Sequence, residues 1–152
     1  MMLSYVRMFL FLSAGFAFTA YFAGGHVMAF FDVPSLVVTV ILPFGYQWFL
    51  FGTAAMKNAF SAGFRKTVSL EDAEKARLFF KTYAHSTWFA AVLAVLIGVI
   101  SMLMNLEDKT RIGPNMALAL LSLSYAVFAN LLIILPNASL IKKRLVELNS
   151  EI

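Results

Sequence analysis

Four apolar stretches, each long enough to cross a bilayer, are the strongest constraint on how this chain can fold. The hydrocarbon core of a membrane requires about 20 helical residues, and apolar runs of this order occupy residues 3–23, 34–56, 86–106 and 113–135. Charged residues make up only 13% of the chain, about half the share that is usual in soluble domains. We therefore expect an all-α membrane protein with four transmembrane helices, forming a single membrane domain over residues 1–152.

The first of these stretches has a second interpretation. Arg7 precedes an apolar run that ends at the small residues Ala23, Gly24 and Gly25, and a basic residue followed by such a run also fits a secretory signal peptide. We expect the segment to be retained as the first transmembrane helix.

Basic residues indicate which segments face the cytoplasm, because short cytoplasmic loops carry an excess of lysine and arginine. The segment 24–33 has none, and the loop after the third stretch has only Lys109 and Arg111, beside Glu107 and Asp108. The other basic residues predict that both termini and the segment 57–85 are cytoplasmic. These residues, which also account for the net charge of +4, are Lys57, Arg65, Lys66, Lys75, Arg77, Lys81, Lys142, Lys143 and Arg144.

The second and third helices should extend beyond the membrane into the cytoplasm. Ser69 begins the pattern of a capping box at a helix start, and Glu71 stands four residues before Lys75, a favourable helical order. Nothing interrupts this helix as far as Leu106, so it should be about 55 Å long. The second helix should likewise continue past the membrane as far as residue 64, with a row of small residues on one face: Gly52, Ala55, Ala59 and Gly63.

The turn on the outer side should run from Asn105 to Gly113. Pro114 would then lie in the first turn of the fourth helix, where a missing N–H costs nothing.

The third and fourth stretches each present a row of small residues with the period of one helix face. Small side chains allow close helix packing in lipid, whereas most of the aromatic residues lie in the first two stretches, so we expect helices one and two to be outer and helices three and four inner. Either the two small faces are packing seams, or they enclose something within a ring of several copies. They comprise Thr87, Ala91, Ala94, Gly98, Ser101 and Asn105 in the third stretch, and Asn115, Ala119, Ser122, Ala126 and Ala129 in the fourth.

Several segments, in order along most of the chain, resemble the MotA/TolQ/ExbB proton-channel family, and most closely its MotA-like stator subunits. These segments are the Gly24-Gly25 pair, FDVPSL at 31–36, IGVI with ML at 97–103, IGP, MA and AL within 112–120, and Pro136. The resemblance implies an A-type subunit of a proton-driven motor or energy-coupling complex in the bacterial inner membrane. It also implies a homopentamer around two transmembrane helices of a single-span B-type (MotB/ExbD-like) partner, which supplies a titrating aspartate for proton transport.

The chain departs from the family pattern at three places. Leu123 stands where the fourth helix of the family has the threonine that lines its ion path, and Ser122 and Ser124 flank it. Trp88 stands where the third helix normally carries a proline near its start. The segment 57–85 is far shorter than the region through which flagellar stators contact the rotor, so we do not expect docking on a flagellar rotor.

Asp, Glu, Lys and His are absent from the middle of every apolar stretch, although such groups relay protons or bind ions within membranes. The chain alone should therefore not conduct protons, and the resemblance implies that the small faces of the third and fourth helices form a wall around the partner helices. Serines in such helices also commonly bond their own backbone, and Asn130 could join two helices. The candidate pore-lining and partner-facing residues are Ala91, Ala94, Gly98, Ser101, Ala119, Ser122, Ser124, Ala126 and Asn130.

Other polar residues have simpler interpretations. Asp32 precedes Pro34 at a helix start, where capping competes with a role in proton entry. His26 and His85 should lie at opposite membrane interfaces, too far apart to share a metal, and the chain has no cysteine.

We expect no enzyme activity, no cofactor and no metal. The alternative function is a homo-oligomeric membrane scaffold without ion flux, followed by a generic four-helix transporter.

Overall fold

The computed structural model describes residues 2–22, 27–65 and 67–150, and within these ranges it is helical with no strand. Two of the sequence features discussed above, the Gly24-Gly25 pair and His26, lie outside the described residues, as does Lys66. In chain order the elements are α1 (Met2–Phe22), a 3₁₀ turn η1 (Val27–Phe30), α2 (Val33–Leu36), a π-helical turn η2 (Val37–Ile41), α3 (Leu42–Ala62), α4 (Leu70–Met104), α5 (Lys109–Ala129), a second π-helical turn η3 (Asn130–Ile134) and α6 (Leu135–Ser150).

Three helical runs are long and apolar enough to cross a membrane. They are Val33–Ala62, Leu70–Met104 and Lys109–Ser150, and the apolar part of α1 within the described residues, Tyr5–Phe18, is shorter. The all-helical character expected from the sequence is therefore confirmed within the described residues, together with three helical runs of the length and apolarity that a membrane span needs.

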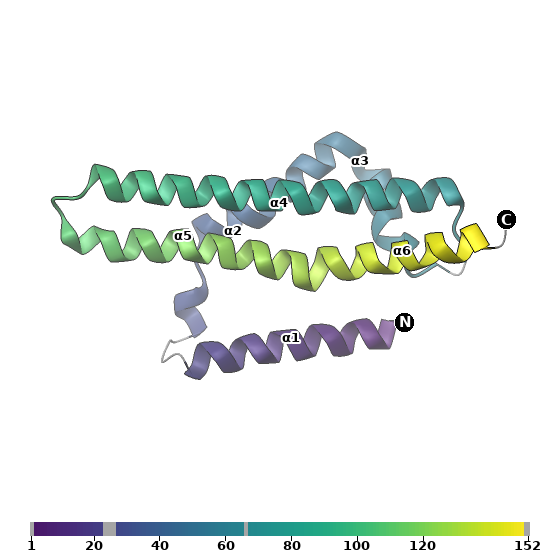
Figure 1. Ribbon diagram of the computed structural model, residues 1–152, viewed down its shortest axis with the longest axis horizontal. Coiled ribbons are helices and arrows are strands. Elements are labelled where there is room, and N and C mark those ends of the chain that lie inside the picture. The colour runs from purple at the N-terminus through teal and green to yellow at the C-terminus, as the bar shows by residue number, and fades with distance from the viewer. Residues whose placement is uncertain (1, 23–26, 66, 151–152) are drawn as a thin grey trace.

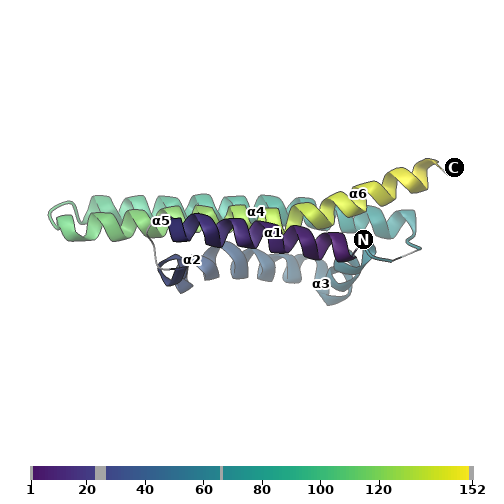
Figure 2. The same cartoon turned by 90° about the horizontal axis from the view of Figure 1, so that it is seen from below.

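The helices are arranged around an antiparallel pair. Figure 1 shows α4 lying along the continuous run of α5 and α6, with α2 and α3 against one face of this pair and α1 beside α5 and α6. One end of the molecule carries the start of α1, the end of α6 and the loop between α3 and α4. The loop between α4 and α5 lies at the other end (Figures 1 and 2). Large side chains such as Phe11 on α1 and Phe49 on α3 are exposed.

The start of α4 agrees with the sequence prediction. The Ser69 hydroxyl accepts a hydrogen bond from the Asp72 backbone N–H at 3.1 Å, and Lys75 forms an ion pair with Glu71 one turn away. The helix then runs without interruption to Met104, a length of about 52 Å at 1.5 Å per residue.

The second helical run bends at Gly52, which the sequence pattern places in a row of small residues on one helix face. Gly52 has φ 76° and ψ 166° within α3, a backbone conformation that is open almost only to glycine. The helix changes direction there (Figure 1) and ends at Ala62. The helix therefore ends two residues before the expected residue 64. The expectation that Gly52 belongs to a packing stripe was wrong, because Gly52 forms a kink in the backbone and nothing lies within 4 Å of a Cβ added there.

The turn between α4 and α5 is shorter than expected. Asp108 caps α5 by accepting a hydrogen bond from the Thr110 backbone N–H at 3.1 Å, and its hydrogen bonds with the Thr110 side chain, the Thr110 backbone and Arg111 lower the pKa of its carboxyl group. Because the helix starts at Lys109, Pro114 lies inside α5 and not in its first turn. The expected turn through Gly113 was too long.

The last helical run continues past Pro136, which is the second residue of α6. Proline has no N–H to donate to the carbonyl four residues back, which is that of Leu132. The Tyr5 hydroxyl of α1 donates to this carbonyl at 3.0 Å. The side-chain amide of Asn137 donates to the Ile133 carbonyl at 2.7 Å. The π-helical turn η3 precedes the proline. The helix therefore continues past the proline, because the preceding turn is π-helical and a side chain of another helix bonds the free carbonyl.

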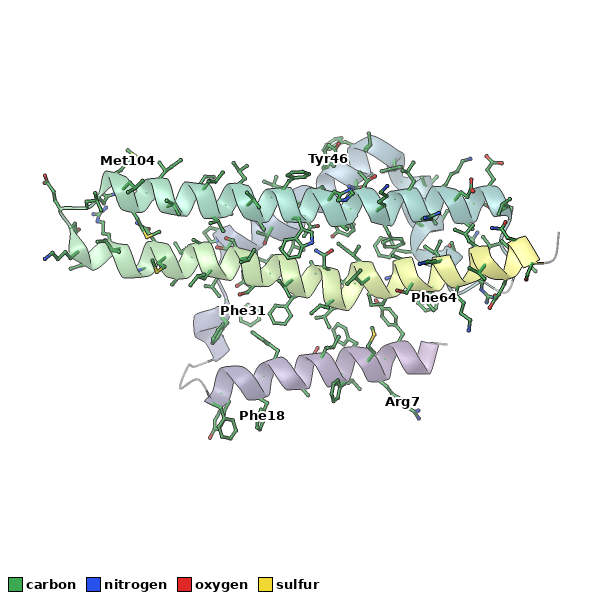
Figure 3. All side chains as sticks on the ribbon, viewed as in Figure 1. Arg7, Phe18, Phe31, Tyr46, Phe64 and Met104 are labelled. Carbon is green, nitrogen blue, oxygen red and sulfur yellow. The ribbon has the colours of Figure 1, made fainter. Side chains whose placement is uncertain are left out.

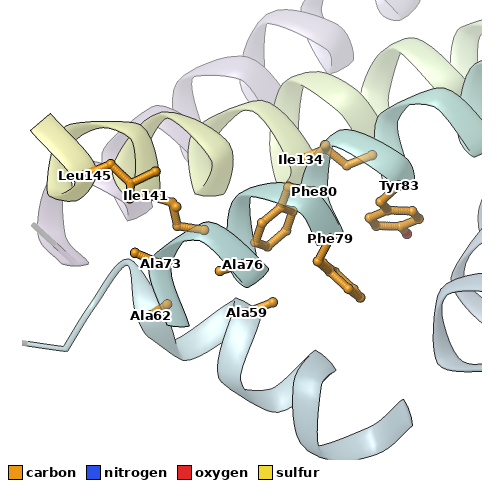
Figure 4. Packing of buried hydrophobic residues seen from close by; sticks show 10 residues of the cluster. All are labelled: Ala59, Ala62, Ala73, Ala76, Phe79, Phe80, Tyr83, Ile134, Ile141 and Leu145. Carbon is orange, nitrogen blue, oxygen red and sulfur yellow. The ribbon is translucent and has the colours of Figure 1, made fainter. Parts of the chain in front are cut away.

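A core of buried apolar residues lies at the end of the molecule that carries the loop between α3 and α4. Side chains from the end of α3, the start of α4, η3 and α6 meet there, with the rings of Phe79 and Phe80 edge to face at 5.2 Å (Figure 4). Much of the segment 57–85 is therefore helix packed into a core. The core comprises Ala59, Ala62, Ala73, Ala76, Phe79, Phe80, Tyr83, Ile134, Ile141 and Leu145.

Candidate functional site

The small faces of the third and fourth predicted helices meet each other within the chain. Ala91 on α4 and Ala126 on α5 are completely buried, and Ala119 and Ser122 on α5 are nearly so. The helices approach closely at Gly98, where an added Cβ atom would lie 2.9 Å from the Cβ of Ala119. In the single chain these residues form a packing seam between α4 and α5. A partner-facing role for them stays a prediction about an assembly.

A cleft of about 160 Å³ opens beside this seam. Three helical runs line it, because η2 packs against both α4 and α5 while α2 packs against α5. The structure thus brings five of the nine sequence-predicted site residues together at one place: Ala94, Gly98, Ser101, Ala119 and Ser122. They are joined there by Asp32, Ser35 and Asn115.

Asp32 lies at the cleft with its carboxylate directed to the helix start. Its Oδ2 accepts a hydrogen bond from the Ser35 backbone N–H at 2.7 Å, so the capping role expected from the sequence is confirmed. The Asp32 backbone N–H donates to the Tyr125 hydroxyl at 2.8 Å, and that hydroxyl donates to the Phe30 carbonyl. Tyr125 therefore holds the entry to α2 against α5.

Sequence reasoning missed Tyr125, although a signal was available. A tyrosine within an apolar stretch brings a hydroxyl that needs a partner when it is not fully exposed. The stretch 113–135 contains one such residue, and its partners lie about 95 positions earlier in the chain.

Two of the serine hydroxyls at the cleft, those of Ser35 and Ser122, already donate hydrogen bonds. Ser122 Oγ donates to the Leu118 carbonyl at 3.0 Å. This is the hydrogen bond to the helix's own backbone that was expected from the sequence as the alternative to a pore-lining role. Ser35 Oγ donates to the same carbonyl from the neighbouring helical run at 3.3 Å. The polar groups thus help to fix α2 on α5, and each hydroxyl oxygen keeps capacity to accept a further hydrogen bond.

Four of the predicted site residues do not line the cleft: Ala91 and Ala126 are buried in the seam, and Ser124 and Asn130 lie elsewhere. Ser124 is two positions from Ser122 and therefore on another face of α5, where its hydroxyl donates to the Leu120 carbonyl at 2.9 Å. Asn130 is buried, and its amide donates to the Ala126 carbonyl of its own helix at 2.9 Å. The bond between helices expected for Asn130 is replaced in the structure by one within its own helix, at the start of η3.

A second buried polar group lies between α3 and α4. Gln47 is completely buried, and its Nε2 donates to the Ser86 hydroxyl at 3.2 Å, which in turn donates to the Tyr83 carbonyl. Its Oε1 has no hydrogen-bond partner within the described part of the chain. Sequence reasoning passed over this residue, although a glutamine inside an apolar stretch needs a polar partner.

The charges of the site are few. Asp32 is the only ionisable residue among those that line the cleft, and within the described ranges no three His, Cys, Asp or Glu side chains are grouped as metal ligands would be. His85 is exposed on α4. The cleft therefore offers hydroxyl, amide and carbonyl groups to a ligand or partner, with one carboxylate at the helix cap.

Known proteins give no independent identification of the chain. No model of a known protein family matches the sequence, and no curated protein matches it.

Proposed function

We propose that this chain is an A-type subunit of a MotA/TolQ/ExbB-like, proton-driven motor or energy-coupling complex. Five copies would surround two transmembrane helices of a single-span partner. The observation that carries the proposal is the cleft beside the α4–α5 seam, where small residues leave room and polar groups gather between otherwise apolar helices.

The cleft is better suited to form one wall of a proton pathway than to relay protons by itself. Ala94, Gly98 and Ser101 remain partly exposed beside the seam, so another helix can approach closely there. A partner aspartate placed at this wall would find hydroxyl and amide groups that can bond its protonated and ionised forms. Proton binding and release would change the charge of the partner helix, and the ring would turn as the packing readjusts.

The proposal includes four spans, with α1 as the first and with both chain ends and the segment 57–85 in the cytoplasm of a bacterium. Support comes from the gathering of the ends of α1 and α6 and of the α3–α4 loop toward one end of the molecule (Figure 1). The basic residues of that loop and of α6 favour the cytoplasmic side.

Proton flux into liposomes tests this function. The purified chain alone should conduct no protons under an imposed potential, measured by quenching of a pH-sensitive dye. The chain with a co-purified single-span partner that carries a membrane aspartate should conduct, and an aspartate-to-asparagine change in that partner should abolish the flux. Flux through the chain alone would refute the mechanism.

The alternative is a scaffold that keeps the ring and has no ion flux. Leu123 in place of the expected threonine and the burial of the seam residues within one chain favour it. A pentamer found by native mass spectrometry, without flux in the presence of every single-span partner that co-purifies, would select the scaffold over the motor.

A further inference from the structure

Helix α1 is attached to the rest of the molecule near its two ends. At one end the Tyr5 hydroxyl donates to the Leu132 carbonyl and accepts from the Asn137 amide at 3.3 Å. Further along, the ring of Phe16 packs on the ring of Phe128 with centroids 4.3 Å apart. Figure 1 shows α1 lying beside α5 and α6 over this length. The middle of α1 is therefore held beside η3 and α6 and not packed into the core.

A groove of about 530 Å³ lies between α1 and the last helical run. Its walls are mostly apolar, with Met8 and Leu12 on one side and Leu131 and Leu135 on the other. From Leu131 to Lys143 the groove follows about 18 Å of helix at 1.5 Å per residue. One leaflet of the hydrocarbon core is about 15 Å thick, so the groove matches the depth of a single leaflet.

The groove ends at a single positive charge. Lys143 lines it, whereas the adjacent Lys142 does not, and Arg7 points away from α6 on the far side of α1 (Figure 3). The nearby carboxylate of Glu147 pairs with Arg144 at 3.0 Å. Among the described residues none forms an ion pair with Lys143, so its ammonium group is available to an anion at the polar end of the groove.

We propose that this groove binds one anionic phospholipid of the cytoplasmic leaflet. An acyl chain lies between α1 and the last helical run, and the phosphate of the headgroup pairs with Lys143. The charge and the apolar walls are complementary to the two parts of such a lipid, and basic pockets between membrane helices on the cytoplasmic side bind lipid headgroups of this kind. The proposal does not depend on proton conduction.

Native mass spectrometry of the purified full chain in detergent tests the proposal. Phosphatidylglycerol and phosphatidylcholine with the same acyl chains are titrated separately, and the number of lipids retained per chain is counted. We expect one retained phosphatidylglycerol per chain and a preference over phosphatidylcholine of about fivefold, the effect of one lysine near an anionic surface.

Matched variants locate the site. Lys143→Gln should remove the preference for phosphatidylglycerol, whereas Lys142→Gln and Arg7→Gln should keep it. Leu12→Trp should fill the groove and reduce retention of both lipids. Equal retention of the two lipids by the unaltered chain, or equal effects of the two lysine variants, would overturn the proposal. The proposal would also be overturned if a second copy of the chain covered the groove. In that case Leu12→Trp would dissociate oligomers and leave lipid retention unchanged.

Discussion

Replacement of Gly98 by alanine is the most direct perturbation of the seam between α4 and α5. The new Cβ would lie 2.9 Å from the Cβ of Ala119 and 3.4 Å from the Asn115 carbonyl oxygen. Carbon atoms in contact are normally about 3.5–4.0 Å apart, so the two helices would have to separate by about 1 Å. Ala91 and Ala126, on the same seam, are completely buried and would lose contact as the helices part.

The expected magnitude follows from two opposing effects. Overpacking of a well-packed core costs about 1–3 kcal/mol, and alanine recovers about 1 kcal/mol over glycine within a helix. The net result should be a loss of about 1 kcal/mol, which lowers the melting temperature of a chain of this size by about 2–4 °C. Gly98→Leu should cost more and should also block assembly of the proposed ring.

Thermal unfolding of the purified chain in detergent, followed by circular dichroism, measures the effect. Gly45→Ala is the matched control, because nothing lies within 4 Å of a Cβ added there, and it should not lower the melting temperature. Ala119→Gly combined with Gly98→Ala should recover part of the loss, since the two residues are in contact. A Gly98→Ala chain as stable as the Gly45→Ala chain would refute the close packing of α4 on α5.

Three further changes test other features. Gly52→Ala should destabilise the chain by about 1–3 kcal/mol, because φ is +76° there; an unchanged melting temperature would mean that α3 is straight. Tyr5→Phe should cost about 1 kcal/mol and speed amide exchange in α1, and unchanged exchange would contradict the bond to Leu132. Ser69→Ala should cost about 1 kcal/mol by removing the cap and speed exchange in the first turn of α4; equal protection there would refute the cap.

The sequence by itself determined the features that depend on a few neighbouring residues. Apolar length predicted the helical runs, and the spacing around Ser69 and Asp32 predicted two helix caps that the structure contains. The bond of Ser122 to its own helix is local for the same reason. These features rest on interactions across three or four positions, which a sequence pattern displays directly.

Only the tertiary structure decided which small faces meet, where helices bend and how the cleft is built. The rows of small residues predict close packing but not a partner, and the structure pairs Gly98 with Ala119 in the same chain. The Tyr5 bond that supports the helix through Pro136 joins residues 127 positions apart. Such contacts depend on the relative placement of whole helices, which no local spacing encodes.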